Sequence, residues 1–128
     1  MSSKLAEWFG LEGRVALVTG GGANGGIGHA VAVALAHAGA DVLVSDIDGA
    51  GAAETAREVQ ALGRRAASVP ADLGQPDDVL AMMAALDREF ARVDILVNNV
   101  GVGHRSRPRC ARSSAGRPRG SPGRCRPG

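Results

Sequence analysis

The residues with the clearest chemical potential form a glycine-rich segment near the N-terminus. It runs from Thr19 to Gly28 with the sequence Thr-Gly-Gly-Gly-Ala-Asn-Gly-Gly-Ile-Gly, between an apolar run and a helical pattern. Backbone N–H groups at a helix start carry partial positive charge, and glycine has no Cβ to keep a phosphate away from them. The segment predicts a phosphate cradle for a dinucleotide, with a flexible turn as the alternative. Its predicted contact residues are Gly20, Gly22, Asn24, Gly26, Ile27 and Gly28.

A carboxylate follows at the spacing expected for a ribose contact. Asp46 lies eighteen residues after Gly28, at the end of an apolar run, and no Lys or Arg lies between Arg14 and Arg57. Such a carboxylate accepts hydrogen bonds from ribose hydroxyls and repels a 2′-phosphate, so it favours NAD over NADP. Ile47 beside it joins the predicted cofactor site. The alternative is a turn, because Asp46-Ile47-Asp48-Gly49 has a composition typical of turns.

Other residues that could do chemistry are sparse. His29 and His37 stand on a predicted helix without an Asp or Ser arrangement, so we interpret them as solvated or rim residues. Cys110 and Cys125, with only His104 nearby, fall short of four zinc ligands, and no metal site is predicted.

The elements that must position these residues alternate as in βαβ units around a parallel sheet. The apolar runs 15–18, 42–44 and 95–97, with a weaker run at 66–69, predict buried strands. Helical spacing over 27–38, 52–62 and 76–90 predicts the helices between them, with Gly39 and Gly63 closing the first two and Pro76 opening the third.

Right-handed crossovers arrange these four strands in the order 3-2-1-4, an α/β, doubly wound, Rossmann-type sheet of which only the N-terminal half is present. The run Ile95-Leu96-Val97 would then lack a neighbour on one side. We therefore expect self-association or aggregation through this exposed sheet edge. Trp8 and Phe9 are expected to pack an N-terminal turn against the domain.

Charge divides the chain into two unlike parts. Residues 1–102 hold all thirteen Asp and Glu and seven Lys and Arg, a net charge of −6, whereas residues 103–128 hold eight Arg and no acid, a net charge of +8. The second part has no Leu, Ile, Val, Met or Phe, and we expect it to be a disordered Arg/Pro/Gly-rich tail. Its composition, dominated by residue types with GC-rich codons such as Arg, Pro, Gly and Ala, suggests an out-of-frame sequence. A non-specific nucleic-acid-binding arm is the less favoured alternative. No apolar run is long enough to span a bilayer and no leader pattern is evident, so a cytoplasmic protein is expected.

Several motifs together resemble the short-chain dehydrogenase/reductase family. They are Leu11 to Gly20, the glycine segment, Asp46, Ala71-Asp72-Leu73 and Asn98-Asn99-Val100-Gly101, in the family's order and at about its spacing. The resemblance covers residues 11–101, roughly the N-terminal 40% of such an enzyme, and marks residues 1–102 as a partial NAD(P)-binding Rossmann domain.

The resemblance implies further contacts with a nicotinamide dinucleotide. Asp72 would bind the adenine amino group, with Leu73 beside the ring, although Asp72 could instead cap a turn. Asn98, Val100 and Gly101 would line the cofactor pocket. Two departures are notable: five residues, rather than the family's three, separate Thr19-Gly20 from Gly26-Ile27-Gly28, and Val100 replaces an Ala. The longer loop leaves open which of Gly21, Gly22 and Gly25 makes the close approach.

The family's activity implies an oxidoreductase that moves a hydride between NAD(P) and a carbonyl or alcohol substrate. In the family a Tyr acts as acid/base, a Lys four residues later supports it and a Ser orients the substrate. This chain has no Tyr, and its only Lys is Lys4. No catalytic residue is therefore assigned, and we expect this chain to be a truncated, inactive member of the family. A small-molecule substrate is expected only for a full-length relative. The alternative is a fragment with residual dinucleotide binding and no catalysis.

Overall fold

The computed structural model describes residues 4–101. The predicted tail, with His104, Cys110 and Cys125, lies outside the described residues. The elements in chain order are α1 (Lys4–Phe9), β1 (Val15–Thr19), α2 (Ile27–His37), β2 (Asp41–Asp46), α3 (Gly49–Ala61), β3 (Ala66–Pro70), α4 (Pro76–Phe90) and β4 (Ile95–Val97).

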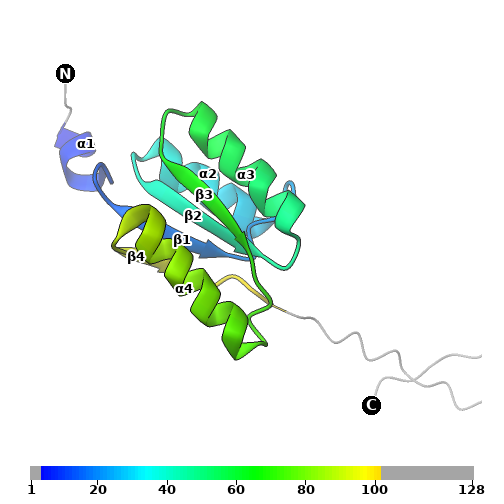
Figure 1. Ribbon diagram of the computed structural model, residues 1–128. Helices are drawn as coiled ribbons and strands as arrows, with labels where there is room; N and C mark the ends of the chain where they lie inside the picture. The colour runs from blue at the N-terminus through cyan, green and yellow to red at the C-terminus, as the bar shows by residue number, and fades with distance from the viewer. Residues whose placement is uncertain (1–3, 102–128) are drawn as a thin grey trace, which may run out of the picture.

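The four strands form one parallel sheet in the order β3-β2-β1-β4, which confirms the predicted order (Figure 1). The register places Leu17 beside both Leu43 and Leu96. Because all strands run in parallel, the loops that follow β1, β2, β3 and β4 emerge at the same end of the sheet. The predicted site residues follow those strands and are gathered at that end.

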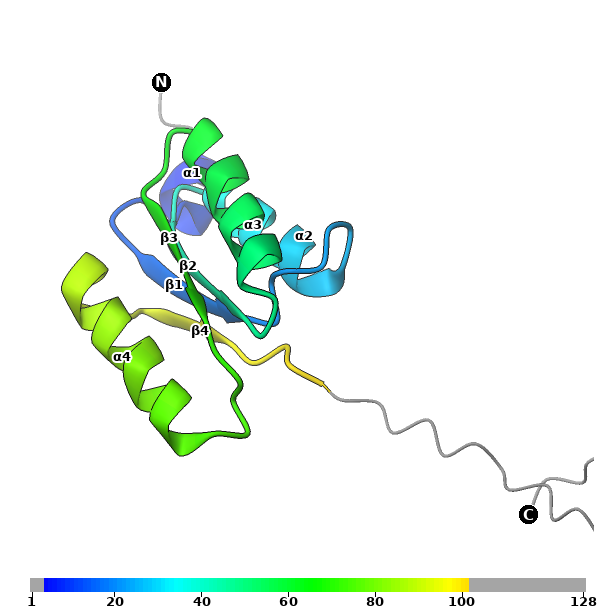
Figure 2. The ribbon, with the colours of Figure 1, turned by 45° about the vertical axis from the view of Figure 1, so that its right-hand side comes forward.

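Two apolar layers hold the helices to the sheet. Successive side chains of a strand point to opposite faces, so Ala16 and Val18 pack with α2 and α3, while Val15 and Leu17 pack with α4. Figure 2 shows α2 and α3 on one face and α4 on the other. The two central strands, β1 and β2, are buried almost throughout, as expected of a parallel sheet covered on both faces.

The predicted helix boundaries have the expected local causes. Gly39 and Gly63 follow α2 and α3 with φ of +108° and +84°, a conformation that glycine adopts without a Cβ clash. Pro76 occupies the first turn of α4, where its missing N–H costs no intrahelical bond. One helix end was not foreseen: Ala91 takes φ of +58° at the end of α4 and donates its N–H to Leu86 and Asp87.

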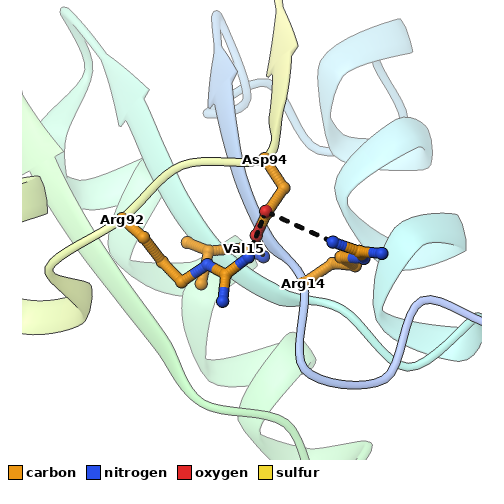
Figure 3. A network of polar contacts seen from close by, with 4 residues as sticks. All are labelled: Arg14, Val15, Arg92 and Asp94. Atoms are coloured by element: carbon orange, nitrogen blue, oxygen red, sulfur yellow. Dashed lines mark hydrogen bonds and ion pairs between the residues drawn. The ribbon is translucent and has the colours of Figure 1, made fainter.

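An acidic side chain attaches the edge strand β4 to β1 (Figure 3). Asp94 accepts the N–H of Val15 on Oδ2 at 2.9 Å, and its own N–H donates to the Val15 carbonyl at 2.8 Å. Its Oδ1 accepts from the Arg92 guanidinium and lies 3.6 Å from Nη1 of Arg14. The hydrogen bond from Arg92, followed by that from Val15, holds the pKa of Asp94 below its usual value.

The N-terminal segment differs from the expectation. Residues 4–9 form a helix, α1, none of whose residues is buried, and Trp8 and Phe9 are each 70% exposed. The expectation that they pack against the domain is wrong, since both side chains are mostly exposed and α1 lies beyond the sheet's end (Figure 1). No helix in the described part of the chain is long and apolar enough to cross a membrane.

Candidate functional site

The glycine loop, residues 20–26, connects the end of β1 to the start of α2. Its first residue is fixed on the sheet, since the Gly20 N–H donates to the Ser45 carbonyl at 2.7 Å and Gly20 has φ of +71°. Gly26 is the N-cap of α2 and makes no side-chain capping bond. The first N–H groups of a helix have no intrahelical partner, so those at the start of α2 are available to an anion.

The structure divides the roles of the loop glycines, which the sequence left open. A Cβ on Gly22 would lie 2.8 Å from Cγ of Asp46, and a Cβ on Gly21 would lie 2.6 Å from Cγ1 of Val44, so both glycines let the loop pass close to β2. Gly25 meets nothing within 4 Å and is required for its φ of +74° instead. A Cβ on Gly28 would lie 2.3 Å from the Gly20 carbonyl oxygen, so Gly28 permits α2 to start directly against β1.

Asp46 serves the local turn and faces a pocket at the same time. Its Oδ2 accepts the Gly22 N–H at 2.8 Å, and its Oδ1 accepts the Asp48 N–H at 2.9 Å. Asp48 in turn caps α3 by accepting the Gly51 N–H at 3.1 Å. A carboxylate offers about four lone-pair sites in all, so both oxygens keep acceptor capacity for a ribose hydroxyl. The turn role and the binding role are therefore compatible.

Asn99 links three segments beneath the loop. Its Nδ2 donates to the Gly20 carbonyl at 3.0 Å, and its N–H donates to Oγ1 of Thr19 at 3.1 Å. The Thr19 hydroxyl donates to the Val97 carbonyl at 3.0 Å. This network fixes the ends of β1 and β4 against each other. Asn99 was not among the predicted site residues, which included Asn98 instead.

The alternation of side-chain direction along a strand predicts on which face of the sheet Asn98 and Asn99 each lie. Leu96 lies on the face that α4 covers and Val97 on the opposite face, so a continued alternation puts Asn98 on the α4 side and Asn99 on the α2 side. Asn98 accordingly lines an apolar cavity of about 300 Å³ next to α4, with Leu17, Met82 and Leu96.

Most of the predicted site residues surround one pocket of about 380 Å³ at the carboxyl ends of the strands. The predicted residues that line it are Gly20, Gly26, Ile27, Asp46, Ile47, Asp72, Leu73, Val100 and Gly101, and Ala23, Ala71 and Asn99 are additional. Gly22 and Asn24 instead line a smaller polar pocket of about 160 Å³ against α3. Gly28, in the first turn of α2, is buried against the Gly20 carbonyl.

Charge at the 380 Å³ pocket is negative on one side. Asp46 and Asp72 both line it, and no Lys or Arg is among its lining residues within the described chain. Asp72 also forms a turn: its Oδ1 accepts the Gly74 N–H at 2.9 Å, and its N–H donates to Oδ2 of Asp78 at 2.8 Å. Within residues 4–101, no three His, Cys, Asp or Glu side chains gather into a metal-binding group.

Comparison with known proteins gives one consistent result. A family model described as short chain dehydrogenase matches residues 14–114. The 2-dehydro-3-deoxy-D-gluconate 5-dehydrogenase of Escherichia coli is 44% identical over 94 residues, which cover 73% of this chain and 36% of the relative. An uncharacterized oxidoreductase of Mycobacterium tuberculosis is 40% identical over 97 residues, covering 76% and 36%.

Solved structures agree in fold. A short-chain type dehydrogenase/reductase from Mycobacterium marinum has a TM-score of 0.71 at 36% identity and covers 80% of this chain and 40% of its own. The Pseudomonas aeruginosa RhlG/NADP active-site complex has a TM-score of 0.67 at 41% identity, with coverage of 74% and 37%. The chain thus spans 36% of the length of the two curated relatives named above.

Proposed function

The chain belongs to the short-chain dehydrogenase family, and on that basis we propose that its glycine loop and the adjoining 380 Å³ pocket bind a nicotinamide dinucleotide, with NAD preferred to NADP. When bound, such a cofactor carries a hydride to or from a substrate. The observation that carries the proposal is the arrangement of Asp46, which lines the pocket while its carboxylate accepts the N–H of Gly22 in the loop.

The pyrophosphate end of the proposed site is supported by the start of α2. Gly26 leaves the first N–H groups of the helix without a side-chain cap, and Gly26, Ile27 and Gly20 line the pocket there. Gly28 brings this helix start close to the Gly20 carbonyl, where a Cβ would not fit. Uncapped N–H groups at a helix N-terminus bind phosphate through hydrogen bonds and the helix dipole. We therefore assign the two phosphates to this end.

The adenosine end is assigned to the opposite, acidic side of the pocket. Asp46 would accept ribose hydroxyls, Ile47 and Leu73 supply apolar contact for the adenine ring, and Asp72 would accept from its amino group. All four residues line the pocket. The P. aeruginosa structure named above is an NADP complex, so NADP is the competing cofactor. The NAD preference rests on Asp46 together with the lack of any Lys or Arg among the described lining residues.

The activity of a whole protein built on this segment would be oxidation of an alcohol or reduction of a carbonyl by hydride transfer. For the 128 residues alone we propose dinucleotide binding without turnover. The sequence has no Tyr to act as the family's acid/base, and general acid–base catalysis alone contributes roughly 10²- to 10⁴-fold. Cofactor-dependent turnover by these 128 residues, followed as absorbance of the reduced nicotinamide, would contradict this part of the proposal.

The test of the binding site compares Asp46→Asn with a matched control, Asp48→Asn. NAD and NADP are titrated into the ¹⁵N-labelled chain, and amide shifts report both affinity and location. We expect shifts at Gly20, Gly26 and Ile27 with NAD.

Asp46→Asn removes the charge that faces a 2′-phosphate. Charges about 4 Å apart repel by about 1 to 4 kcal/mol near a protein surface. The variant should therefore raise NADP affinity relative to NAD by about tenfold or more. Asp48→Asn changes a carboxylate that caps α3, and the ratio should stay unchanged. A ratio that Asp46→Asn leaves unaltered would remove the assigned role of Asp46.

A further inference from the structure

The helix α3 contacts the glycine loop through residues that do not line the 380 Å³ pocket. Three of its residues face the loop at positions i, i+4 and i+7, one stripe of a helix: Gly51, Thr55 and Glu58. A Cβ on Gly51 would lie 2.1 Å from the Gly22 carbonyl oxygen, and the Thr55 hydroxyl donates to the Gly21 carbonyl at 2.7 Å. The first half of the loop is thus attached to α3 directly.

The second half of the loop is attached through His29. The Gly25 N–H donates to Nδ1 of His29 at 3.3 Å, and Nε2 of the same ring lies 2.6 Å from Oε2 of Glu58. The ring is largely covered, with 17% of its side chain exposed, although the sequence alone suggested only a solvated or rim residue. His29 therefore bridges the loop and α3, whereas His37 on the same helix is exposed.

These contacts fix the protonation state that the bridge requires. An ionised Glu58 carboxylate only accepts hydrogen bonds, so Nε2 carries the proton that lies between the two residues. Nδ1 accepts the Gly25 N–H only when it carries no proton. Protonation of Nδ1 would place two hydrogens against each other and break the link to the loop, while the contact with Glu58 would be retained as an ion pair.

Within residues 4–101, two carboxylates line the polar pocket around the His29 ring. The polar pocket of about 160 Å³ around the ring is lined from α3 by Glu54 and Glu58 and from the loop by Gly22 and Asn24. Residues 20–36 contain no titratable side chain besides His29. Glu54 and Glu58 are therefore the charged groups that face the ring.

We propose that His29 is a positioning residue for the dinucleotide: in its neutral form it holds the Gly25 end of the loop in the shape that accepts the pyrophosphate. This inference rests on the proposed function. Gly25 has a positive φ and no packing contact at its Cβ position, and the loop between Gly20 and Gly26 has five residues. The bond to His29 and the bond from the Gly26 N–H to the Ala23 carbonyl, at 2.8 Å, are the hydrogen bonds that restrain this end within the described residues. A typical net hydrogen bond corresponds to roughly a two- to tenfold change in affinity.

Two substitutions separate the halves of the bridge. His29→Asn keeps an acceptor close to the position of Nδ1 and loses the contact with Glu58. His29→Gln keeps a donor close to the position of Nε2 and loses the acceptor for Gly25. Neither amide titrates, and His37→Gln is the matched control on the same helix.

The experiment uses the 128-residue chain labelled with ¹⁵N-glycine, with NAD as the probe, across roughly pH 5 to 8, where histidine side chains titrate. Without NAD, we expect the Gly25 amide to shift with pH in the unsubstituted chain and in His37→Gln, and to stay constant in both His29 variants. NAD affinity should fall roughly two- to tenfold toward pH 5 in the unsubstituted chain. The His29→Gln variant should bind NAD weakly at every pH. The NAD affinity of the His29→Asn variant should stay, at every pH, close to that of the unsubstituted chain at neutral pH.

The outcomes distinguish this inference from the proposed function. A Gly25 amide that does not respond to pH, or an NAD affinity that is independent of pH while that amide titrates, overturns the role of His29 and leaves dinucleotide binding standing. Failure of NAD to bind at any pH contradicts the proposed function, and the positioning role is then lost with it. A change confined to thermal stability, with the same pH profile in all variants, assigns His29 a purely structural role and overturns the inference.

Discussion

Replacement of Gly28 by alanine should loosen the attachment of α2 to the sheet. A Cβ at this position would lie 2.3 Å from the Gly20 carbonyl oxygen and 2.6 Å from Nδ2 of Asn99. Close carbon–oxygen contacts are about 3.3 to 3.6 Å, so the helix start or the Gly20 peptide must move by about 1 Å. Gly20 is not free to move, because its N–H donates to the Ser45 carbonyl at 2.7 Å and its carbonyl accepts from Asn99.

The expected cost is the sum of two losses and one gain. Forcing an extra methyl into a packed site costs about 1 to 3 kcal/mol. Loss of the Asn99–Gly20 hydrogen bond adds about 0.5 to 1.5 kcal/mol. Alanine is the better helix former by up to about 1 kcal/mol, which offsets part of the loss. We expect a net decrease of about 0.5 to 4.5 kcal/mol in the free energy of unfolding, measured by urea denaturation with circular dichroism.

A double-mutant cycle with Asn99→Ala tests whether the cost arises where the geometry places it. Both substitutions remove the same Asn99–Gly20 hydrogen bond, so the cost of Gly28→Ala should be smaller by about 0.5 to 1.5 kcal/mol in the Asn99→Ala background. An unchanged urea midpoint for Gly28→Ala, or a strictly additive cycle, would refute the reasoning.

Two further predictions concern the edge strand β4. Because the pKa of Asp94 is lowered in the folded chain, its ionised carboxylate stabilises the fold above the ordinary aspartate pKa of about 3.9, and this stability is lost as the pH falls through the lowered value. Asp94→Asn should therefore lower the urea midpoint at pH 7 and flatten its acid dependence, whereas Glu89→Gln, in the exposed pair with Arg88, should not; equal acid dependence in all three chains would contradict the role of Asp94. Within residues 4–101, strand β4 pairs only with β1, and Leu96 is 57% exposed, so Leu96→Lys should shift the chain toward monomer in sedimentation velocity, while Leu80→Lys on α4, 69% exposed, should have less effect. An unsubstituted chain that is already monomeric would contradict self-association through this edge.

The fold followed from features that are local in the sequence. The apolar runs, the glycines after α2 and α3, and Pro76 each act within a few residues of where they stand, so the four strands, their order and the helices α2, α3 and α4 were predicted from the sequence. The exposure of Trp8 and Phe9 was not predictable from the local pattern, because it depends on where α1 lies relative to the sheet.

The site was predictable where a residue follows a strand end, because parallel strands bring such positions together. Gly20, Asp46 and Asp72 therefore line one pocket. The supporting contacts were not predictable, since they join residues far apart: Asn99 to Gly20 spans 79 positions and His29 to Glu58 spans 29. The different roles of Gly22 and Gly28 likewise depend on their distances to Asp46 and Gly20, which the spacing of residues in the sequence does not predict.

The central claim is that this chain binds a nicotinamide dinucleotide at the glycine loop and that Asp46 makes NAD the preferred form. Calorimetric titration of the unsubstituted 128-residue chain with NAD and with NADP, at the same pH and salt concentration, tests it most directly. We predict saturable binding of NAD at one site per chain and weaker binding of NADP by about tenfold, because the Asp46 carboxylate faces the 2′ position. No heat of binding with either cofactor, or NADP binding as tight as NAD or tighter, would contradict the account.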